Sequence, residues 1–112
     1  QEYRLAPEIT ELIGNAVGSR NPVHQFEVTL RDGNGRRVCQ DATLLTVTVE
    51  NGTLLGLENG DLADTTEYSA NYRRAYRGQL IIYAADNEAT SADTPLTVTV
   101  RGDFIRTERI TV

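Results

Sequence analysis

The segment Leu-Thr-Val-Thr-Val-Arg at residues 96–101 decides the fold class. Its apolar side chains, Leu96, Val98 and Val100, alternate with polar ones. Successive side chains of a β-strand point to opposite faces, so this alternation predicts a strand with one face in a core and the other in water. Threonine and valine are β-branched and favour the extended conformation over a helix.

The same alternation, or a short apolar run, recurs along the rest of the chain. The segments concerned are 9–13, 26–30, 45–50, 78–85 and 105–112. The run at residues 78–85, Gly-Gln-Leu-Ile-Ile-Tyr-Ala-Ala, is nearly continuous and predicts a central strand packed on both faces.

Turn-forming residues separate these strands. They occupy residues 32–35, 51–52, 59–61 and 86–95. Residues 32–35, Asp-Gly-Asn-Gly, predict a hairpin turn between two strands, because glycine and asparagine tolerate positive φ. Residues 64–77 are the least regular part, and they favour either a short helical turn or extended chain crossing between sheets.

The chain has 112 residues, which suits one domain. Its seven to nine short predicted strands, with turns at regular spacing, predict a single all-β, immunoglobulin-like antiparallel sandwich over residues 1–112. We expect this domain to be a fragment of a larger chain, with residues 1–7 as an interdomain connection.

The charge balance excludes some partners. Sixteen acidic and 11 basic residues give a net charge of −5, which argues against binding to nucleic acid or to an anionic membrane. No apolar run approaches the roughly 20 residues of a membrane span. The chain shows no basic start followed by an apolar stretch, so no signal peptide is expected.

Cysteine and histidine provide no evident chemistry. Cys39 is the only cysteine, so no internal disulfide is expected and a small semi-buried thiol is the simplest interpretation. A catalytic thiol needs a base beside it, and nothing in the sequence places His24, the only histidine, near Cys39. The sequence predicts no cofactor.

The middle of the chain carries motifs of a known family. They are Leu55-Gly56-Leu57, Asn59-Gly60-Asp61 and Arg74-Ala75-Tyr76-Arg77-Gly78. In this order they resemble the immunoglobulin-like domains at the C-terminal end of glycoside hydrolase family 2 enzymes, the β-galactosidase group. The strand and Asp-Gly turn at residues 26–33 also fit, and the resemblance extends from Val23 to Val112. The chain departs from the family where Arg37 or Val38 replaces a usual proline.

The resemblance implies a division of labour in the parent protein. In such enzymes two catalytic glutamates lie in a TIM barrel, which this chain is too short to contain. It therefore implies a noncatalytic accessory domain that packs on other domains of a bacterial glycoside hydrolase. A secreted or periplasmic location is expected, with the cytoplasm as the alternative.

The turn at Asn59, Gly60 and Asp61 has three interpretations. The acidic and amide side chains nearby are Asn59, Asp61, Asp64 and Glu67. A structural turn is favoured, because side-chain oxygens can accept local backbone N–H groups. A calcium site would use the same oxygens, although no EF-hand spacing is present. In the third interpretation, Asp61 of this loop forms an ion pair with Arg73 or Arg74.

Aromatic and basic residues interleave just before the apolar run at 78–85. They are Tyr72, Arg73, Arg74, Tyr76 and Arg77, followed by Gly78. Such a strip can stack on nucleic-acid bases or sugars. The structural interpretation, which we favour, makes Tyr76 a core anchor and places the arginines on a solvated face or against the loop.

Two short motifs are common by chance. Residues 101–103 spell Arg-Gly-Asp, the tripeptide that integrins read, at a position where a turn is expected. Residues 51–53 match the N-glycosylation pattern, also on a predicted turn. Besides the accessory domain, two alternatives remain at this stage: a cell-surface or adhesin-type module, and a carbohydrate-binding module.

Overall fold

The computed structural model describes residues 5–13, 23–38, 43–61, 64 and 70–112. These residues form eight strands and no helix, so the described chain holds no helix that could cross a membrane. The strands are β1 (Ala6–Ile13), β2 (Val23–Arg31), β3 (Leu44–Glu50), β4 (Gly52–Glu58), β5 (Tyr72–Arg74), β6 (Gln79–Asp86), β7 (Thr97–Gly102) and β8 (Ile105–Thr111).

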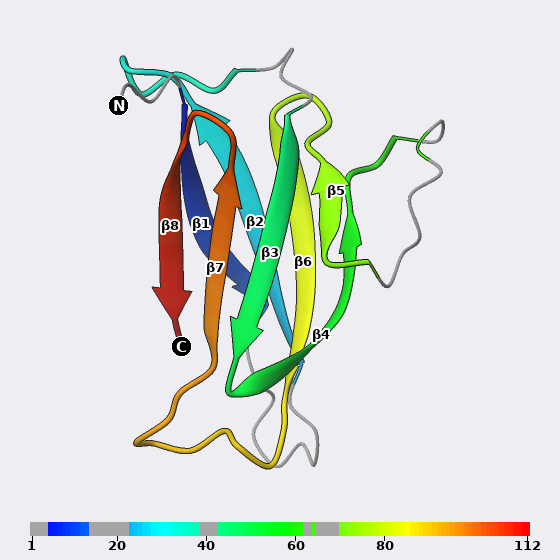
Figure 1. Ribbon diagram of the computed structural model, residues 1–112, viewed down its shortest axis with the longest axis vertical. Coiled ribbons are helices and arrows are strands. Elements are labelled where there is room, and N and C mark those ends of the chain that lie inside the picture. Colours follow the sequence, from blue (N-terminus) through cyan, green and yellow to red (C-terminus); the bar gives the residue numbers. More distant parts are fainter. Residues whose placement is uncertain (1–4, 14–22, 39–42, 62–63, 65–69) are drawn as a thin grey trace.

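The strands form two four-stranded sheets that pack face to face (Figure 1). One sheet has the order β1-β2-β6-β4 and the other β5-β3-β7-β8, with antiparallel pairing between neighbours. Immunoglobulin constant domains have strands A, B, E and D in one sheet and C, F and G in the other. Here β1, β2, β6 and β4 take the first set, β3, β7 and β8 the second, and β5 adds an edge strand. The predicted immunoglobulin-like sandwich is confirmed.

The core lies between the sheets and consists of the apolar members of the alternating patterns. Phe26 and Val28 of β2, Val47 of β3, and Val98 and Val100 of β7 are at most 1% exposed. Full burial of an apolar side chain of this size stabilises a protein by about 1.5–3 kcal/mol. The alternation that predicted the strands is therefore also the pattern that builds the core.

Strand β6 is central in its sheet, between β2 and β4, as its apolar sequence predicted. Leu80, Ile82 and Ala84 are fully buried between the sheets. Ile81 and Tyr83, on the opposite face, are only half-buried. The expectation that β6 packs on both faces is thus wrong for the outer face, because the sandwich covers only one side of each sheet.

Part of the predicted connection over residues 1–7 is β-strand. Residues 1–4 lie outside the described part of the chain, but Ala6 and Pro7 belong to β1 and Pro7 is buried. Proline lacks the N–H that a central strand needs, and β1 tolerates it because it is an edge strand.

The turn after β2 forms, and the described residues directly beyond it, 36–38, form no strand. The Asp32 carboxylate accepts the N–H groups of Asn34 at 2.9 Å and Arg36 at 3.1 Å, which fixes the turn. These bonds favour the charged carboxylate and lower the pKa of Asp32. Among the residues described beyond the turn, Arg37 bridges to Arg31, and the Val38 N–H donates to the Leu30 carbonyl at 3.0 Å.

The irregular segment contains a short strand. Residues 72–74 form β5 against β3, with Leu45 opposite Arg73 and Thr46 opposite Tyr72. Extended chain is therefore present in this segment, while residues 65–69 lie outside the described part.

Candidate functional site

The turn at residues 59–61 follows β4 and is held by local hydrogen bonds. The Asp61 N–H donates to Asn59 Oδ1 at 2.9 Å, the arrangement of an Asx turn. Gly60 has φ +80°, a conformation that disfavours residues with a Cβ atom. The Asp64 N–H then donates to the Asp61 carbonyl at 3.1 Å. This geometry is that of a structural turn, with a conformational reason for Gly60.

Asn59 also ties this turn to β5. Its Nδ2 group donates to Asp64 Oδ2 at 2.6 Å and to the Arg74 carbonyl at 2.8 Å. Arg73 Nη1 lies 3.4 Å from Asp64 Oδ2, and both side chains are almost buried. Asp64 thus forms an ion pair of the kind that the sequence suggested for Asp61, whose own pairing with an arginine stays a prediction.

We expect Asn59→Ala to destabilise the domain by about 1–3 kcal/mol, because it leaves the Asp64 carboxylate and the Arg74 carbonyl without the Asn59 donor.

Saturating calcium should leave the melting temperature of the wild-type domain unchanged. Thermal unfolding of both proteins, with calcium and with chelator, checks this expectation. A calcium-dependent rise that Asn59→Ala abolishes would make the loop a metal site.

The described residues offer no metal-ligand cluster. In this part of the chain no group of three or more histidine, cysteine or acidic side chains is placed so that it could hold a metal ion. Glu67 and Cys39 lie outside the described residues.

A tight turn joins the chain after β5 to β6. The main chains of Tyr76 and Gln79 exchange hydrogen bonds of 2.9 and 3.0 Å. The two residues between them have positive φ, +54° at Arg77 and +75° at Gly78. Positive φ at both central positions is the signature of a type I′ hairpin turn, which strongly favours glycine. The Gly78 carbonyl also accepts the Leu30 N–H at 2.8 Å.

The turn places Tyr76 differently from the expected core anchor. Ala75, one position earlier, is 2% exposed, whereas Tyr76 is only half-buried. The Arg77 guanidinium carbon lies 5.3 Å from the centre of the Tyr76 ring, within cation–π range. Tyr76 therefore packs at the rim of the sandwich, because alternation directs Arg73 and Ala75 inward instead.

The aromatic and basic strip does not form one continuous face. Arg73 is 6% exposed, while Tyr72 is 48% exposed on the outer face of its sheet. Tyr72 and Arg101 are the register partners of Thr46 on either side. Next to this row is a hollow of about 380 Å³ lined by Thr46, Arg101, Gly102, Asp103 and Thr107.

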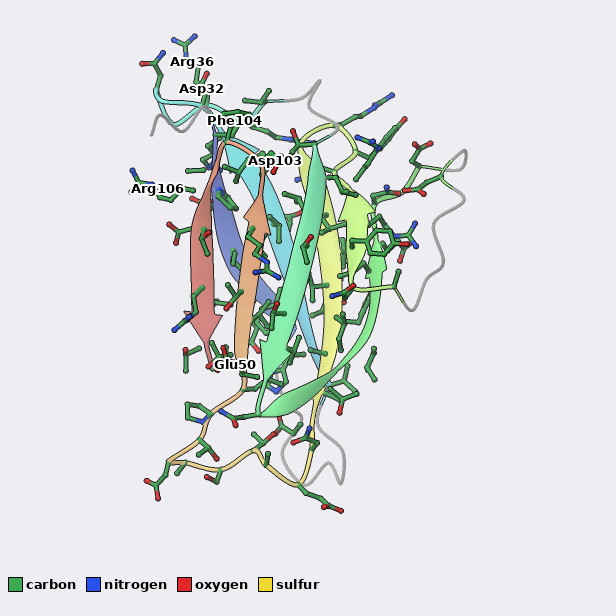
Figure 2. All side chains as sticks on the ribbon, in the orientation of Figure 1. Asp32, Arg36, Glu50, Asp103, Phe104 and Arg106 are labelled. Atoms are coloured by element: carbon green, nitrogen blue, oxygen red, sulfur yellow. The ribbon has the colours of Figure 1, made fainter. Side chains whose placement is uncertain are left out.

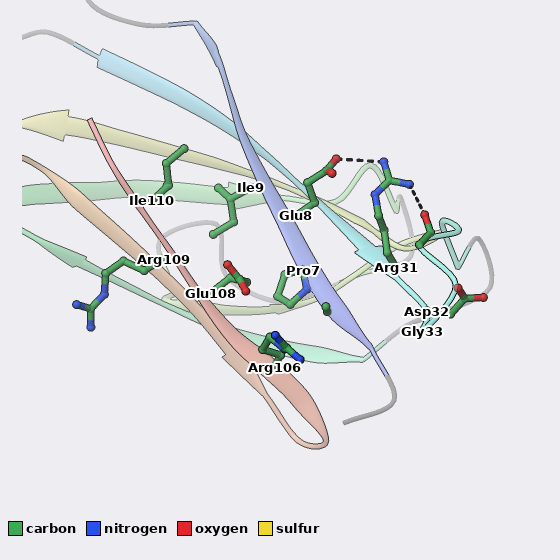
Figure 3. A pocket seen from close by; sticks show the side chains of 12 residues that line it. Pro7, Glu8, Ile9, Arg31, Asp32, Gly33, Arg106, Glu108, Arg109 and Ile110 are labelled. Atoms are coloured by element: carbon green, nitrogen blue, oxygen red, sulfur yellow. Dashed lines mark hydrogen bonds and ion pairs between the residues drawn. The ribbon is translucent and has the colours of Figure 1, made fainter. Parts of the chain in front are cut away.

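A larger groove of about 610 Å³ lies between the edge strands β1 and β8 and the turn after β2 (Figure 3). Both acidic and basic side chains line this groove. Arg31 Nη2 lies 3.1 Å from Glu8 Oε1, and Nη1 donates to the Gly35 carbonyl at 3.1 Å. Arg31 and Glu8 are thus bound to each other across the strands.

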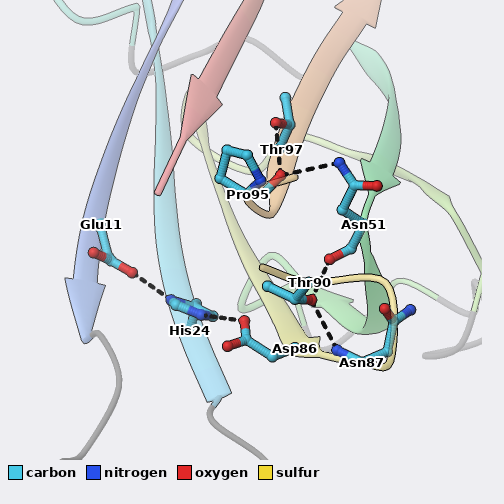
Figure 4. A network of polar contacts seen from close by, with 8 residues as sticks. All are labelled: Glu11, His24, Asn51, Asp86, Asn87, Thr90, Pro95 and Thr97. Carbon is cyan, nitrogen blue, oxygen red and sulfur yellow. Dashed lines mark hydrogen bonds and ion pairs between the residues drawn. The ribbon is translucent and has the colours of Figure 1, made fainter. Parts of the chain in front are cut away.

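His24 forms a buried charge cluster (Figure 4). Its Nδ1 lies 2.6 Å from Glu11 Oε2 on β1, and its Nε2 lies 2.8 Å from Asp86 Oδ1 on β6. Charged carboxylates only accept hydrogen bonds, so the protonated ring, which donates from both nitrogens, satisfies both contacts at once. Burial alone lowers the pKa of His24, but the hydrogen bonds and charges of Glu11 and Asp86 outweigh it and raise the pKa above its ordinary value.

This cluster was not predicted, although one local signal for it exists. His24 has the same parity along β2 as the buried Phe26, and their rings stack with centroids 6.0 Å apart. Parity therefore indicates an inward side chain. Because both nitrogens are occupied by carboxylates, His24 has no free nitrogen to act as a general base.

The two short motifs lie on turns. Residues 101–103 lie where β7 passes into β8, and residues 51–53 lie where β3 passes into β4. Both positions agree with the turns that the sequence predicted.

Two antiparallel sheets in this order, with acidic side chains engaged in structural contacts, define an immunoglobulin-like module. The sequence profile of glycoside hydrolase family 2 C-terminal domain 5 matches residues 15–111. The chain belongs to this family, in agreement with the motif resemblance. Among curated proteins, none matches the chain significantly by sequence.

Solved structures of longer chains contain the same fold. A β-glycosidase from Bacteroides vulgatus superposes with a TM-score of 0.83 at 21% identity, over 100% of this chain and 14% of its own. A glycosyl hydrolase family 2 member from Bacteroides cellulosilyticus has a TM-score of 0.83 at 18% identity, over 100% of this chain and 15% of its own. The Parabacteroides merdae β-glucuronidase has a TM-score of 0.71 at 20% identity, over 99% of this chain and 12% of its own. This chain therefore spans about one seventh of their length.

Proposed function

We propose that the domain is a noncatalytic accessory C-terminal domain of a bacterial glycoside hydrolase resembling β-galactosidase. In this proposal it packs on the catalytic or neighbouring domains of its parent, which is secreted or periplasmic. Membership of the family 2 C-terminal domains supports the proposal, as do structural neighbours whose own chains are about seven times longer. Those neighbours are described as a β-glycosidase and β-glucuronidases.

The observation that carries the noncatalytic role is the use of the acidic side chains. A glycosidase needs two carboxyl groups that flank a sugar, one as acid and one as nucleophile or base. Here several of the described carboxylates are engaged in contacts within the domain. Glu8 pairs with Arg31, Asp64 with Arg73, and Glu11 and Asp86 with His24. Asp32 accepts the backbone of its own turn.

We expect the isolated domain to lack glycosidase activity, because the two catalytic carboxyl groups would come from another domain of the parent. The test assays the domain and the full-length parent side by side with chromogenic β-galactoside and β-glucuronide substrates. Turnover by the parent alone supports the proposal. Turnover by the domain that is lost on Glu8→Gln or Glu108→Gln, in the groove between β1 and β8, would refute it.

Carbohydrate binding is a second candidate, favoured by one observation. Tyr72 is exposed in a row with Thr46 and Arg101 beside the smaller hollow. An aromatic face with nearby hydroxyl and guanidinium groups can stack on a sugar ring and bind its hydroxyls. A binding assay of the same isolated domain with a galactan tests this candidate. Binding by the wild type that is lost in Tyr72→Ala would favour carbohydrate binding over a purely packing role.

A further inference from the structure

The hairpin between β7 and β8 displays an exposed aromatic residue in a strained conformation. Phe104, at its tip, has φ +58° and is 55% exposed, the largest exposure among the described large apolar side chains. Positive φ is a genuine outlier for a bulky residue, and glycine or asparagine is the usual choice at such a position. Within the domain, this exposed ring gains little burial to offset the strain. Strain of this kind persists where the surrounding structure enforces it, commonly at functional positions.

The tip has a rigid base. The Arg106 N–H donates to the Leu5 carbonyl at 3.0 Å, and Leu5 forms a parallel bridge with Ile105. Leu5 and Ile105 are both buried. Gly102 packs so closely on β3 that a Cβ there would lie 2.9 Å from the Leu44 carbonyl oxygen. Phe104 is thus held in place on the core.

Charged side chains share the end of the sandwich that carries this aromatic tip. Arg36 and Arg106 lie at the same end as Phe104, together with Asp32 and Asp103 (Figure 2). Arg37, which follows Arg36 in the chain, and Arg77 are exposed, and the Arg37 guanidinium donates to the Arg77 carbonyl at 3.0 Å. We call these seven residues the Phe104 end surface. It carries four arginines and two aspartates on a chain of net charge −5, so it is locally basic.

The same end receives the N-terminal side of the polypeptide. Leu5, the first described residue, is hydrogen-bonded to the hairpin base, and β1 begins at this end of the sandwich (Figure 1). In the structural neighbours this fold is 12–15% of the chain, so most of the polypeptide belongs to other domains. Leu5 therefore lies at the base of the hairpin that carries Phe104.

We propose that the Phe104 end surface docks on the domain that precedes this one in the parent chain, at an acidic surface with an apolar pocket for the Phe104 ring. The inference rests on the proposed function, because it needs a multidomain parent. Aromatic residues and arginine are the side chains most enriched at interface hot spots. The basic rim complements carboxylates, and a covalent link to the preceding domain raises the effective concentration of the two surfaces.

The first test is hydroxyl-radical footprinting of the full-length parent chain. Phe104 and Tyr72 have comparable exposure in the domain, so Tyr72 is the internal reference. Phe104 is expected to be modified several-fold more slowly than Tyr72, and high salt should reduce this protection. Equal modification of the two rings would overturn the proposal. Protection that rises with protein concentration would overturn it as well, since it would indicate a second copy.

The second test uses matched variants of the full-length chain. Phe104→Gly relieves the backbone strain at the tip but removes the ring, and Asn51→Gly relieves positive φ at a turn between other strands. Limited proteolysis should release the domain from Phe104→Gly about tenfold faster than from the wild type, the scale expected for the loss of a hot-spot aromatic residue. The rate of release from Asn51→Gly should equal that of the wild type. Because glycine suits positive φ, faster release cannot be attributed to a misfolded hairpin. Unchanged release from Phe104→Gly would contradict docking through this residue.

Charge reversal tests the acidic partner. Arg36→Glu with Arg106→Glu should also increase release, and Arg109→Glu, further along β8, should not. An unchanged rate in the double variant would overturn the acidic surface. Glycosidase activity of the same preparations separates the two proposals. A parent that is inactive but protects Phe104 refutes the proposed function and supports the docking. A parent that is active but leaves Phe104 unprotected supports the proposed function and refutes the docking.

Discussion

Replacing His24 with alanine is expected to lower the free energy of unfolding by about 3 kcal/mol near pH 5, the usual effect of removing one partner from a buried ion pair. His24 is 4% exposed and joins β1 to β6 through Glu11 and Asp86. Without the imidazolium, these two carboxylates face each other across an unfilled space. The loss of the stacked contact with Phe26 adds to the effect.

The difference between wild type and His24→Ala should shrink as the pH rises. The pKa of His24 is raised on folding from its ordinary value of 6.5, so the folded state binds this proton more tightly than the unfolded state. The stabilisation is therefore fully present below the unfolded pKa and is lost as the pH rises through the folded pKa. The neutral ring still packs and donates one hydrogen bond, so part of the difference remains at high pH. Denaturant unfolding across this range measures it, and a difference that grows with pH would contradict the protonated cluster.

Local patterns were sufficient to predict most of the strands. Val98 and Val100 alternate with threonines, and period-2 alternation is itself the geometry of a strand with one buried face. Gly60 and Gly78 were singled out from the sequence, and both have positive φ. These features depend on a few neighbouring residues, which is why the sequence alone could indicate them.

Contacts between distant segments could not be predicted in this way. His24 is separated from Glu11 by 13 positions and from Asp86 by 62, and only the order β1-β2-β6 brings the three together. Phe104 was not singled out either, because a two-residue hairpin tip has no periodicity. Its strain is visible only once φ is known.

The misplacement of Tyr76 has a related physical cause. An aromatic residue just before an apolar strand suggests a core anchor, but the alternation that buries Arg73 also buries Ala75 and leaves Tyr76, which precedes the type I′ turn, half-buried at the rim. Size and hydrophobicity indicate which residues can fill a core. The alternation along the chain decides which of them point into it.

Phe26→Ala is therefore expected to destabilise the domain far more than Tyr76→Ala. The Phe26 ring is fully buried in β2, opposite Glu11 on β1 and Ile82 on β6. Deleting a buried aromatic ring costs about 3–5 kcal/mol, through lost transfer energy and the cavity that remains. Tyr76 is half-buried and stacks on an exposed guanidinium, so its removal should cost only about 1 kcal/mol, close to a surface substitution.

The two variants can be compared directly by denaturant unfolding under identical conditions. A typical domain has a total stability of about 5–15 kcal/mol, so Phe26→Ala should leave the native state marginal or partly unfolded. Tyr76→Ala should unfold with the wild-type m-value and a small shift of the midpoint, because a rim substitution changes neither the surface exposed on unfolding nor the compactness of the unfolded chain. Equal and large shifts in both variants would show that the Tyr76 ring belongs to the core after all. A small shift for Phe26→Ala would instead mean that the sheets close over the vacated space, so that β2 tolerates an alanine at the centre of the sandwich.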